Sequence, residues 1–363
     1  MEMIAFHAAP ARERQTECKG MVKSGAKRVT IRDLARIAGT SISAASFVMN
    51  DSWERHRISA ETAQRVRRAA DELGYRPNAK ARALRRGRSS LAGLIVPHHR
   101  NRFFAGLAEH FEAGARSRGL VPIIGSTQRD PTVETRVAET LVAQEVELLV
   151  VAGVGDPSRI NRLCRERGVR CVNVDLPGPD SFSVVTDNRG GAFELTRRLL
   201  RGLPEGATVG FLGGQADEYA TELRLDGYRT ALKESGHLSD GSSVLRCGYA
   251  PQAARDALDK LHNEAGALPD ALLVNSITAF EGLATYWRDH PERFAGLRVA
   301  CFDWDPFAAC LPIDTIMLRQ DVEGLIDRCF EWFDTGIDRA GEIVMVPPQL
   351  AIEDPATPNT TEE

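Results

Sequence analysis

The sequence of 363 residues has no apolar run that approaches the roughly 18 residues of a membrane-spanning helix, and its N-terminus lacks the apolar stretch of a signal peptide. Its seven cysteines are scattered, and no two of them form a CxxC pair. Cys171 and Cys301 stand inside apolar runs, which is typical of small core residues rather than of metal ligands. We therefore expect a cytoplasmic, nucleoid-associated protein without a structural zinc site.

Motifs of catalysis are missing as well. There is no GxSxG or HExxH pattern, and none of the eight histidines is spaced for metal binding. Residues 209–214 form a glycine-bearing strand end without the full GxGxxG fingerprint, so Gly213 and Gly214 are typical of a backbone turn. We expect no catalytic residue, no cofactor and no metal, and hence a protein that is not an enzyme. The alternative, an enzyme on α/β layers, would need a catalytic constellation that this sequence lacks.

Charge is distributed unevenly along the chain, although the formal net charge is only −4. Residues 21–88 hold 16 Lys and Arg against 6 Asp and Glu, a net charge of +10. Residues 89–363 hold 27 against 41, a net charge of −14. A compact basic segment joined to an acidic body predicts that the first binds a polyanion and the second does not. The alternative is that the basic surface serves only solubility.

The basic segment contains three short helical patterns. Gly39 suits a left-handed end of the first, Ser41 or Ser43 can cap the second, and Ser59 can cap the third. The apolar positions at helical spacing are Ile31, Leu34, Ala35 and Ala38, then Ala44, Ala45, Val48 and Met49, then Ala63, Val66, Ala70 and Leu73.

From residue 90 onward, apolar runs alternate with amphipathic helices. Such alternation is typical of parallel sheets that helices cover on both faces. The number of β-α units predicts an α/β body of two doubly wound parallel-sheet subdomains. The expected strands are residues 91–96, 120–124, 146–151, 169–174, 184–186, 207–212, 271–274, 299–302 and 315–318, and the expected helices include residues 103–118, 190–200, 253–261 and 279–288. No heptad repeat follows the last strand, so nothing indicates a coiled-coil tetramer.

Residues 31–50, IRDLARIAGTSISAASFVMN, meet the physical requirements of a helix-turn-helix. Ala35 is small enough for two helices to cross closely, and Gly39 allows the tight turn between them. The second helix would then lie in the major groove with Ile42, Ser43 and Phe47 on its outward face. A three-helix mini-domain with another function can show the same apolar pattern.

Residues 29–50 and residues 57–97, RISAETAQRVRRAADELGYRPNAKARALRRGRSSLAGLIVP, resemble the head and hinge of the lac-repressor family of bacterial transcription regulators. The likeness continues to about residue 350, with head, hinge and body in the family's order. Two features are similar to the fructose and sucrose repressors in particular. One is a loop at residues 51–57 that is longer than in the lac repressor, and the other is the pair FLGGQADEYATELRLDGY and IDTIMLRQD.

The resemblance implies a domain order. We expect a disordered tail at residues 1–27, a helix-turn-helix domain at 28–76, a hinge helix at 77–89 and a body at 90–352. The body would resemble a type I periplasmic sugar-binding protein, with subdomains 90–188 plus 320–347 and 189–319 plus 348–352, before a disordered tail at 353–363. The alternative for the first residues is an over-extended gene start, with Met21 as the true initiator.

The resemblance also implies which residues of the head contact DNA: Thr30, Ser41, Ile42, Ser43, Ser46, Phe47 and Asn50. Many relatives carry Arg where this chain has Phe47, and Arg there gives a bidentate contact to guanine. Phe47 cannot donate a hydrogen bond, so it favours a thymine methyl group or packing against the backbone. The family's common operator half-site therefore does not transfer. The alternative is that Phe47 lies in the core of the head.

The hinge resembles the family's hinge helix residue by residue, and its implied DNA contacts are Asn78, Ala81, Arg82 and Leu84. A helix of this length is unstable alone in water, so we expect it to fold only with DNA and a dimer mate. Leu84 matches the wedge that inserts between base steps. The alternative for Leu84 is a linker leucine packed on the body.

Ligands of doubly wound sheets bind beyond the carboxyl ends of the strands. In the body, Asp175 and Asp303 stand at two such ends, and Arg224 stands in the loop or helix start after another strand. The resemblance matches Arg224 and Asp303 to shared effector contacts, and Phe104, Asp175 and Gln320 to more variable ones. Ser276 replaces part of a polar pair of the lac repressor. The alternative is that Arg224 and Asp303 form a structural ion pair.

These observations predict a repressor of sugar-utilisation genes that binds double-stranded operator DNA as a homodimer and does not bind membranes. A sugar or sugar phosphate of the fructose or sucrose type would bind between the two body subdomains and change DNA affinity allosterically. The alternatives are a global regulator of carbon metabolism that also activates genes, and a sugar-transport binding protein.

Overall fold

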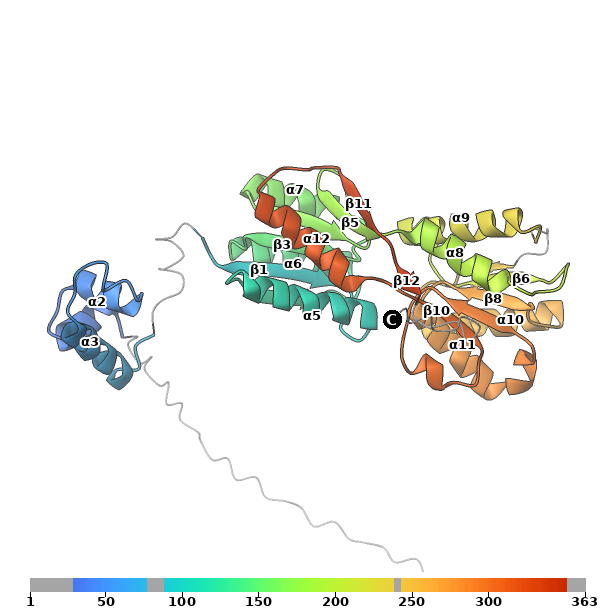
Figure 1. Cartoon of the computed structure of the whole chain (residues 1–363), viewed down its shortest axis with the longest axis horizontal. Coiled ribbons are helices and arrows are strands. Elements are labelled where there is room, and N and C mark those ends of the chain that lie inside the picture. Colours follow the sequence, from blue (N-terminus) through green and yellow to red (C-terminus); the bar gives the residue numbers. More distant parts are fainter. Residues whose placement is uncertain (1–28, 77–87, 238–242, 351–363) are drawn as a thin grey trace, which may run out of the picture. The chain divides into compact units, whose positions relative to one another are not determined.

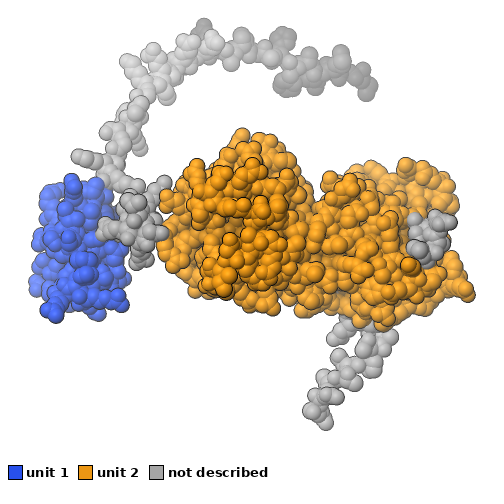
Figure 2. All heavy atoms as spheres, turned by 90° about the horizontal axis from the view of Figure 1, so that it is seen from above, with its two compact units in different colours: residues 1–82 blue, residues 83–363 orange. Residues whose placement is uncertain are grey.

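The computed structural model describes residues 29–76, 88–237 and 243–350 of the chain. The chain divides into two compact units, residues 1–82 and residues 83–363, which Figure 2 colours separately. The predicted tails and the four predicted DNA contacts of the hinge, Asn78, Ala81, Arg82 and Leu84, lie outside the described residues.

Three helices form the described part of the first unit (Figure 1). They are α1 (Ile31–Ile37), α2 (Ile42–Met49) and α3 (Ala60–Glu72). Each begins at a hydroxyl side chain, that of Thr30, Ser41 or Ser59, which accepts a hydrogen bond from a backbone N–H of the first turn. Gly39, at φ +62°, forms the left-handed turn between α1 and α2 that the sequence predicts.

The core of the head consists of small and branched apolar side chains. Leu34 and Ala35 of α1, Val48 of α2 and Val66 of α3 are almost fully buried. The small Ala35 side chain is buried in this core and Gly39 makes the turn, as the sequence predicts for a helix-turn-helix.

The second unit contains two six-stranded sheets, and the first of them has the order β11-β5-β4-β3-β1-β2 with every neighbouring pair parallel. Its strands are β1 (Leu91–Val96), β2 (Val121–Ser126), β3 (Leu148–Ala152), β4 (Arg170–Val174), β5 (Phe182–Thr186) and β11 (Ile343–Val346). Its helices are α5 (Arg102–Ser117), α6 (Pro131–Ala143), α7 (Ser158–Arg167) and α12 (Val322–Thr335). Separate apolar clusters lie under α5 and α12 and under α6 and α7, so helices cover both faces. We call this part the N-lobe.

The second sheet has the order β12-β10-β9-β8-β6-β7, and only β12 runs antiparallel to its neighbour. Its strands are β6 (Val209–Leu212), β7 (Val244–Leu245), β8 (Ala271–Val274), β9 (Arg298–Cys301), β10 (Thr315–Arg319) and β12 (Gln349–Leu350). Its helices are α8 (Asn188–Leu200), α9 (Tyr219–Glu234), α10 (Pro251–Ala265) and α11 (Ile277–Asp289), with 3-10 turns at Pro291–Phe294 and Ala308–Cys310. Again two apolar clusters lie on opposite faces, one under α8 and α9 and one under α10 and α11. We call this part the C-lobe.

The chain crosses between the lobes three times: between β5 and α8, between β10 and α12, and between β11 and β12 (Figure 1). Because the first two crossings follow directly from carboxyl ends of parallel strands, those ends lie at the junction of the lobes. Ligands of doubly wound sheets bind at such ends.

This architecture confirms the predicted fold of a helical head and two parallel-sheet α/β subdomains. The strands β7, β11 and β12 were not among the expected runs. β7 and β12 have two residues each, too few for a pattern. β11 lies at the edge of its sheet, where Ile343 and Met345 are exposed, so the sequence shows no continuous buried run there.

Candidate DNA-binding and effector sites

The head presents most of its predicted DNA contacts to solvent. Ile42 is 47% exposed, and Ser43 and Asn50 are also exposed, whereas Ala45 and Val48 on the other side of α2 are buried. Thr30 and Ser41 are exposed residues that also cap their helices. Ser46 differs from the rest because it is 8% exposed, and the side chain of Asn50 donates to its backbone carbonyl at 2.7 Å.

Phe47 is half-buried and stacks on His56, with ring centroids 3.5 Å apart and ring planes at 15°. His56 belongs to the long loop after α2, whose Asp51 carboxylate accepts from Arg67 of α3 at 2.6 Å. The loop therefore supports the aromatic side chain of α2 from outside the apolar core. The sequence did not predict a role for His56. The only indication in the sequence was that the loop containing it, residues 51–57, is longer than in the lac repressor.

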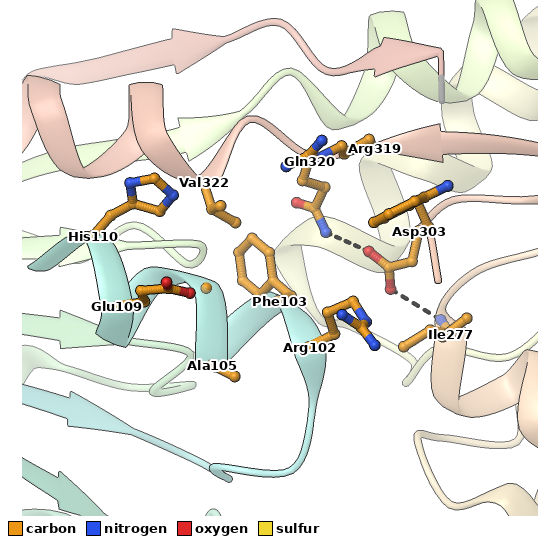
Figure 3. A pocket seen from close by; sticks show the side chains of 12 residues that line it. Arg102, Phe103, Ala105, Glu109, His110, Ile277, Asp303, Arg319, Gln320 and Val322 are labelled. Atoms are coloured by element: carbon orange, nitrogen blue, oxygen red, sulfur yellow. Dashed lines mark hydrogen bonds between the residues drawn. The ribbon is translucent and has the colours of Figure 1, made fainter. Parts of the chain in front are cut away.

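All six predicted effector-binding residues line one cleft of about 630 Å³ between the lobes. Phe104 and Asp175 come from the N-lobe, Arg224, Ser276 and Asp303 from the C-lobe, and Gln320 from the second crossing. They belong to different strand ends and helix starts, so the strand topology brings them together. Asp303 and Gln320 also line a smaller pocket of about 220 Å³, shown in Figure 3.

Asp303 follows β9 and is held from two sides (Figure 3). One carboxylate oxygen accepts from the backbone N–H of Ile277 at 2.9 Å, and the other accepts from the Gln320 amide at 2.7 Å. The Gln320 oxygen accepts in turn from Thr186 of β5 at 2.6 Å, so this chain of bonds joins two of the three crossings. Burial raises the pKa of Asp303, while Arg224, Gln320 and Ile277 oppose the shift.

Arg224 lies in the second turn of α9. The sequence predicted a position in the loop or at the start of the helix, so the residue lies slightly further along the helix than expected. Its Nε donates to Asn188 Oδ1 at 2.8 Å, its Nη1 donates to the carbonyl of Asn275 at 2.6 Å, and its guanidinium carbon lies 3.9 Å from the centroid of the Phe302 ring. Within the described residues, Arg224 and Asp303 form no direct ion pair. The guanidinium is instead fixed by neutral oxygens and an aromatic face.

Asp175 directly follows β4, has a left-handed φ of 73° and is 8% exposed. Burial raises its pKa to about 6, although Arg224 and Arg129 oppose the shift. In contrast to Asp303, its carboxylate accepts no hydrogen bond from the described residues. Because Asp175 lines the cleft, its carboxylate can accept hydrogen bonds from O–H or N–H groups of a ligand there.

Phe104 and Ser276 are neutral residues that line the cleft. Phe104 is 4% exposed and packs edge-on against Phe103 at 5.0 Å between centroids. Ser276 caps α11 by accepting from the N–H of Ala279 at 3.3 Å, and its hydroxyl also contacts that of Thr278 at 3.0 Å.

The cleft also contains residues that we did not predict. Arg129, in the loop before α6, lies with its guanidinium over the ring of Tyr249 at 5.1 Å, and Tyr249 donates a hydrogen bond to Glu218. Asn275, next to Ser276, does not line the cleft, and both of its side-chain polar atoms are buried without a hydrogen-bond partner within the described part of the chain. Arg129 and Tyr249 stand in loops without periodicity, so only the three-dimensional structure brings them to the site.

Two classes of site are not found among the described residues. No group of three or more His, Cys, Asp or Glu side chains there can hold a metal ion. None of the helices in the same residues is long and apolar enough to cross a membrane.

Comparisons with known proteins assign both parts of the chain. The family profile of periplasmic binding protein domains matches residues 92–308, and that of bacterial regulatory proteins of the lacI family matches residues 30–78. The sucrose operon repressor of Klebsiella pneumoniae is 31% identical over 320 residues, which are 86% of this chain and 93% of the repressor. The chain is a member of the lacI family.

Two further relatives of this lacI-family protein are similar in sequence. The ribitol operon repressor of Klebsiella aerogenes is 43% identical over 193 residues, which are 52% of this chain and 72% of the relative. The fructose operon regulatory protein of Vibrio cholerae is 29% identical over 338 residues, 89% of this chain and 99% of the relative. The protein is thus a transcriptional repressor of the sugar-operon type, and it is not an enzyme.

Solved structures show the same fold. The lac repressor dimer bound to operator and the anti-inducer ONPF has a TM-score of 0.75 at 20% identity, covering 90% of this chain and 98% of that one. The Cra transcriptional dual regulator of Pseudomonas putida in complex with fructose 1-phosphate has a TM-score of 0.65 at 21% identity, covering 72% and 98%.

Proposed function

We propose that this protein represses sugar-utilisation genes and that a sugar or sugar phosphate of the fructose or sucrose type, bound in the 630 Å³ cleft, controls its DNA affinity. The observation that carries the proposal is that six residues selected from the sequence as effector contacts line a single cleft. Carboxylates there can accept from sugar hydroxyls, and Arg224 can donate to a ring or phosphate oxygen.

For DNA, we propose a homodimer in the bacterial cytoplasm, associated with the nucleoid, that binds a pseudo-palindromic operator. The paired α2 helices would lie in successive major grooves, with contacts from Thr30, Ser41, Ile42, Ser43, Ser46, Phe47 and Asn50. The hinge residues Asn78, Ala81, Arg82 and Leu84 would enter the minor groove between them. Exposure of Ile42 and Ser43 beside buried Val48 supports this orientation of α2.

Control by the effector requires that it binds the two lobe arrangements unequally. The bonds from Thr186 through Gln320 to Asp303 join the crossings to the cleft floor, so a ligand at Asp303 acts directly on the segments that connect the lobes. We expect an allosteric coupling of about 1–3 kcal/mol, which corresponds to a roughly 5- to 150-fold change in operator affinity.

Fluorescence anisotropy on the gene's own upstream DNA, titrated with fructose, fructose phosphates, sucrose and ribose, tests the proposal. Arg224→Ala should keep operator binding and lose the response to the effector. Arg229→Ala is the matched control, because Arg229 lies on the same helix but is exposed and does not line the cleft. A normal effector response of Arg224→Ala would contradict the assignment of the cleft. Transcription assays on the same promoter would separate repression from the alternative, a global regulator that also activates.

A further inference from the structure

The chain enters the body through a short segment, residues 88–90, that has neither helical nor strand structure. This segment directly follows residues 77–87, which belong to the predicted hinge, and it directly precedes β1. It is the covalent connection through which the body holds the hinge. The attachment of these three residues to the body therefore decides how well the position of the hinge is defined.

Glu147 holds this segment with both oxygens of its side chain. Oε2 accepts from Nε of Arg88 at 2.9 Å and lies 2.9 Å from Nη2 of the same guanidinium. Oε1 accepts from the backbone N–H of Ser90 at 2.8 Å. The side chain of Glu147 is only 12% exposed, whereas that of Arg88 is 69% exposed. A carboxylate that is set in the body thus binds two residues of the segment at once.

The backbone at this point is fixed from both neighbouring strands. Glu147 directly precedes β3, and its N–H donates to the carbonyl of Leu91 in β1 at 2.8 Å. The carbonyl of Ser90 accepts from the N–H of Val121 in β2, also at 2.8 Å. Ser90 has a left-handed φ of 56°, which residues other than glycine rarely adopt. Hydrogen bonds to its N–H and its carbonyl hold it in this conformation, so the chain leaves the sheet in a defined direction.

Arg88 is the last of four arginines within residues 82–88. The alternative role for it is a contact with a DNA phosphate, which is the commonest use of basic side chains in a DNA-binding segment. Its Nε and Nη2, however, both lie at hydrogen-bond distance from one oxygen of Glu147. A guanidinium in such a pair has to leave the carboxylate before it can bind a phosphate. The geometry therefore favours a role in holding the chain.

We propose that Glu147 is a positioning residue that fixes the DNA-binding hinge to the N-lobe through Arg88 and Ser90. The hinge then keeps one position relative to this lobe when it meets the operator. This inference rests on the proposed function, since it takes residues 77–87 to be a DNA contact.

Fluorescence anisotropy with the full-length protein tests the inference on two duplexes of equal length, the gene's own upstream DNA and a random sequence. Glu147→Gln keeps the shape of the side chain and removes its charge, and Arg88→Gln removes the guanidinium but keeps the bond from Ser90 to Glu147. Each variant should bind the upstream DNA roughly 3- to 10-fold more weakly, the size of a partly exposed charge-assisted contact. Binding to random DNA should change little, whereas a general loss of folded protein would weaken binding to both duplexes equally.

The double variant Glu147→Gln/Arg88→Gln separates the two roles of Arg88. If both residues act through one contact, the double variant should bind the upstream DNA within about twofold of the weaker single variant. The slope of log affinity against log salt concentration should also be the same in Arg88→Gln as in the wild type. Loss of a phosphate contact would instead reduce the steepness of that slope by about 0.9 for each contact. Additive losses in the double variant, or a reduced slope, overturn the inference.

Glu139→Gln is the matched control, because Glu139 pairs with Arg159 at 3.4 Å in the same lobe and its substitution changes the net charge equally. It should bind both duplexes as the wild type does. Leu84→Ala separates the inference from the proposed function. If Leu84→Ala weakens binding to the upstream DNA while Glu147→Gln and Arg88→Gln bind it as tightly as the wild type, the inference is overturned and the proposed function stands. If Leu84→Ala also binds both duplexes normally, the proposed hinge contacts fail, and the inference fails with them.

Discussion

Asp175→Asn should stabilise the folded protein at neutral pH while it changes a proposed effector contact. The carboxylate is 8% exposed, accepts no hydrogen bond from the described residues and has a pKa raised to about 6 from an ordinary value of 3.8. Because each pKa unit corresponds to about 1.4 kcal/mol, ionised Asp175 costs the folded state up to about 3 kcal/mol. Asparagine has nearly the same shape and carries no charge, so it avoids this cost.

The sign of the pH dependence follows from the raised pKa. The folded state holds the proton of Asp175 more tightly than the unfolded state, so the wild type loses stability as pH rises through about 6. The advantage of Asp175→Asn should therefore be about 3 kcal/mol at pH 8 and fall below about 1 kcal/mol at pH 4, where Asp175 is protonated in the folded state and partly protonated in the unfolded state.

Urea denaturation of the full-length variant and wild type at several pH values, followed by tryptophan fluorescence, measures this difference. Asp217→Asn is the matched control, because Asp217 also has a left-handed φ, of 62°, but is exposed. The control accounts for the preference of this backbone conformation for Asn over Asp. An advantage of Asp175→Asn that does not change with pH, or one no larger than that of Asp217→Asn, would refute the reasoning.

Three other substitutions test separate parts of the molecule. His56→Ala removes the ring that stacks on Phe47. It should weaken operator binding roughly 3- to 10-fold in anisotropy titrations, which is the size expected for the loss of an aromatic pair. Unchanged affinity would mean that the stack does not orient Phe47. Leu84→Ala should weaken specific binding far more than binding to random DNA, and equal losses would exclude a wedge. Gly227→Ala places a methyl group against the backbone oxygen of Arg189. It should lower the free energy of unfolding of the C-lobe by about 1–3 kcal/mol in urea denaturation. An unchanged urea midpoint would show that α8 and α9 can move apart without cost.

The helices of the head could be predicted because their signals are local. Thr30, Ser41 and Ser59 cap helices within three residues of themselves, and Gly39 makes its turn alone. The same holds for Asp303, because a polar residue directly after a buried strand lies at the carboxyl edge of a parallel sheet wherever that strand pairs.

Contacts between charged side chains of different lobes could not be predicted in this way. The contact between Arg129 and Glu218 joins residues of different lobes, and it depends on how the crossings bring the lobes together. The stack of Phe47 on His56 depends on the path of an irregular loop. In each case the contact between the two residues has no local signal, so only the tertiary structure identifies the pair.

The three crossings have a consequence for synthesis of the protein on the ribosome. The core under α5 is completed by α12, where Phe330 stacks on Phe111 at 5.7 Å between centroids, and β11 closes the same sheet. At about 5–20 residues per second, more than 200 intervening residues delay this partner by roughly 10–40 s. The apolar face of α5 and its sheet therefore stays uncovered while the C-lobe from α8 to β10 is made, and during this interval the nascent chain exposes apolar surface that can aggregate.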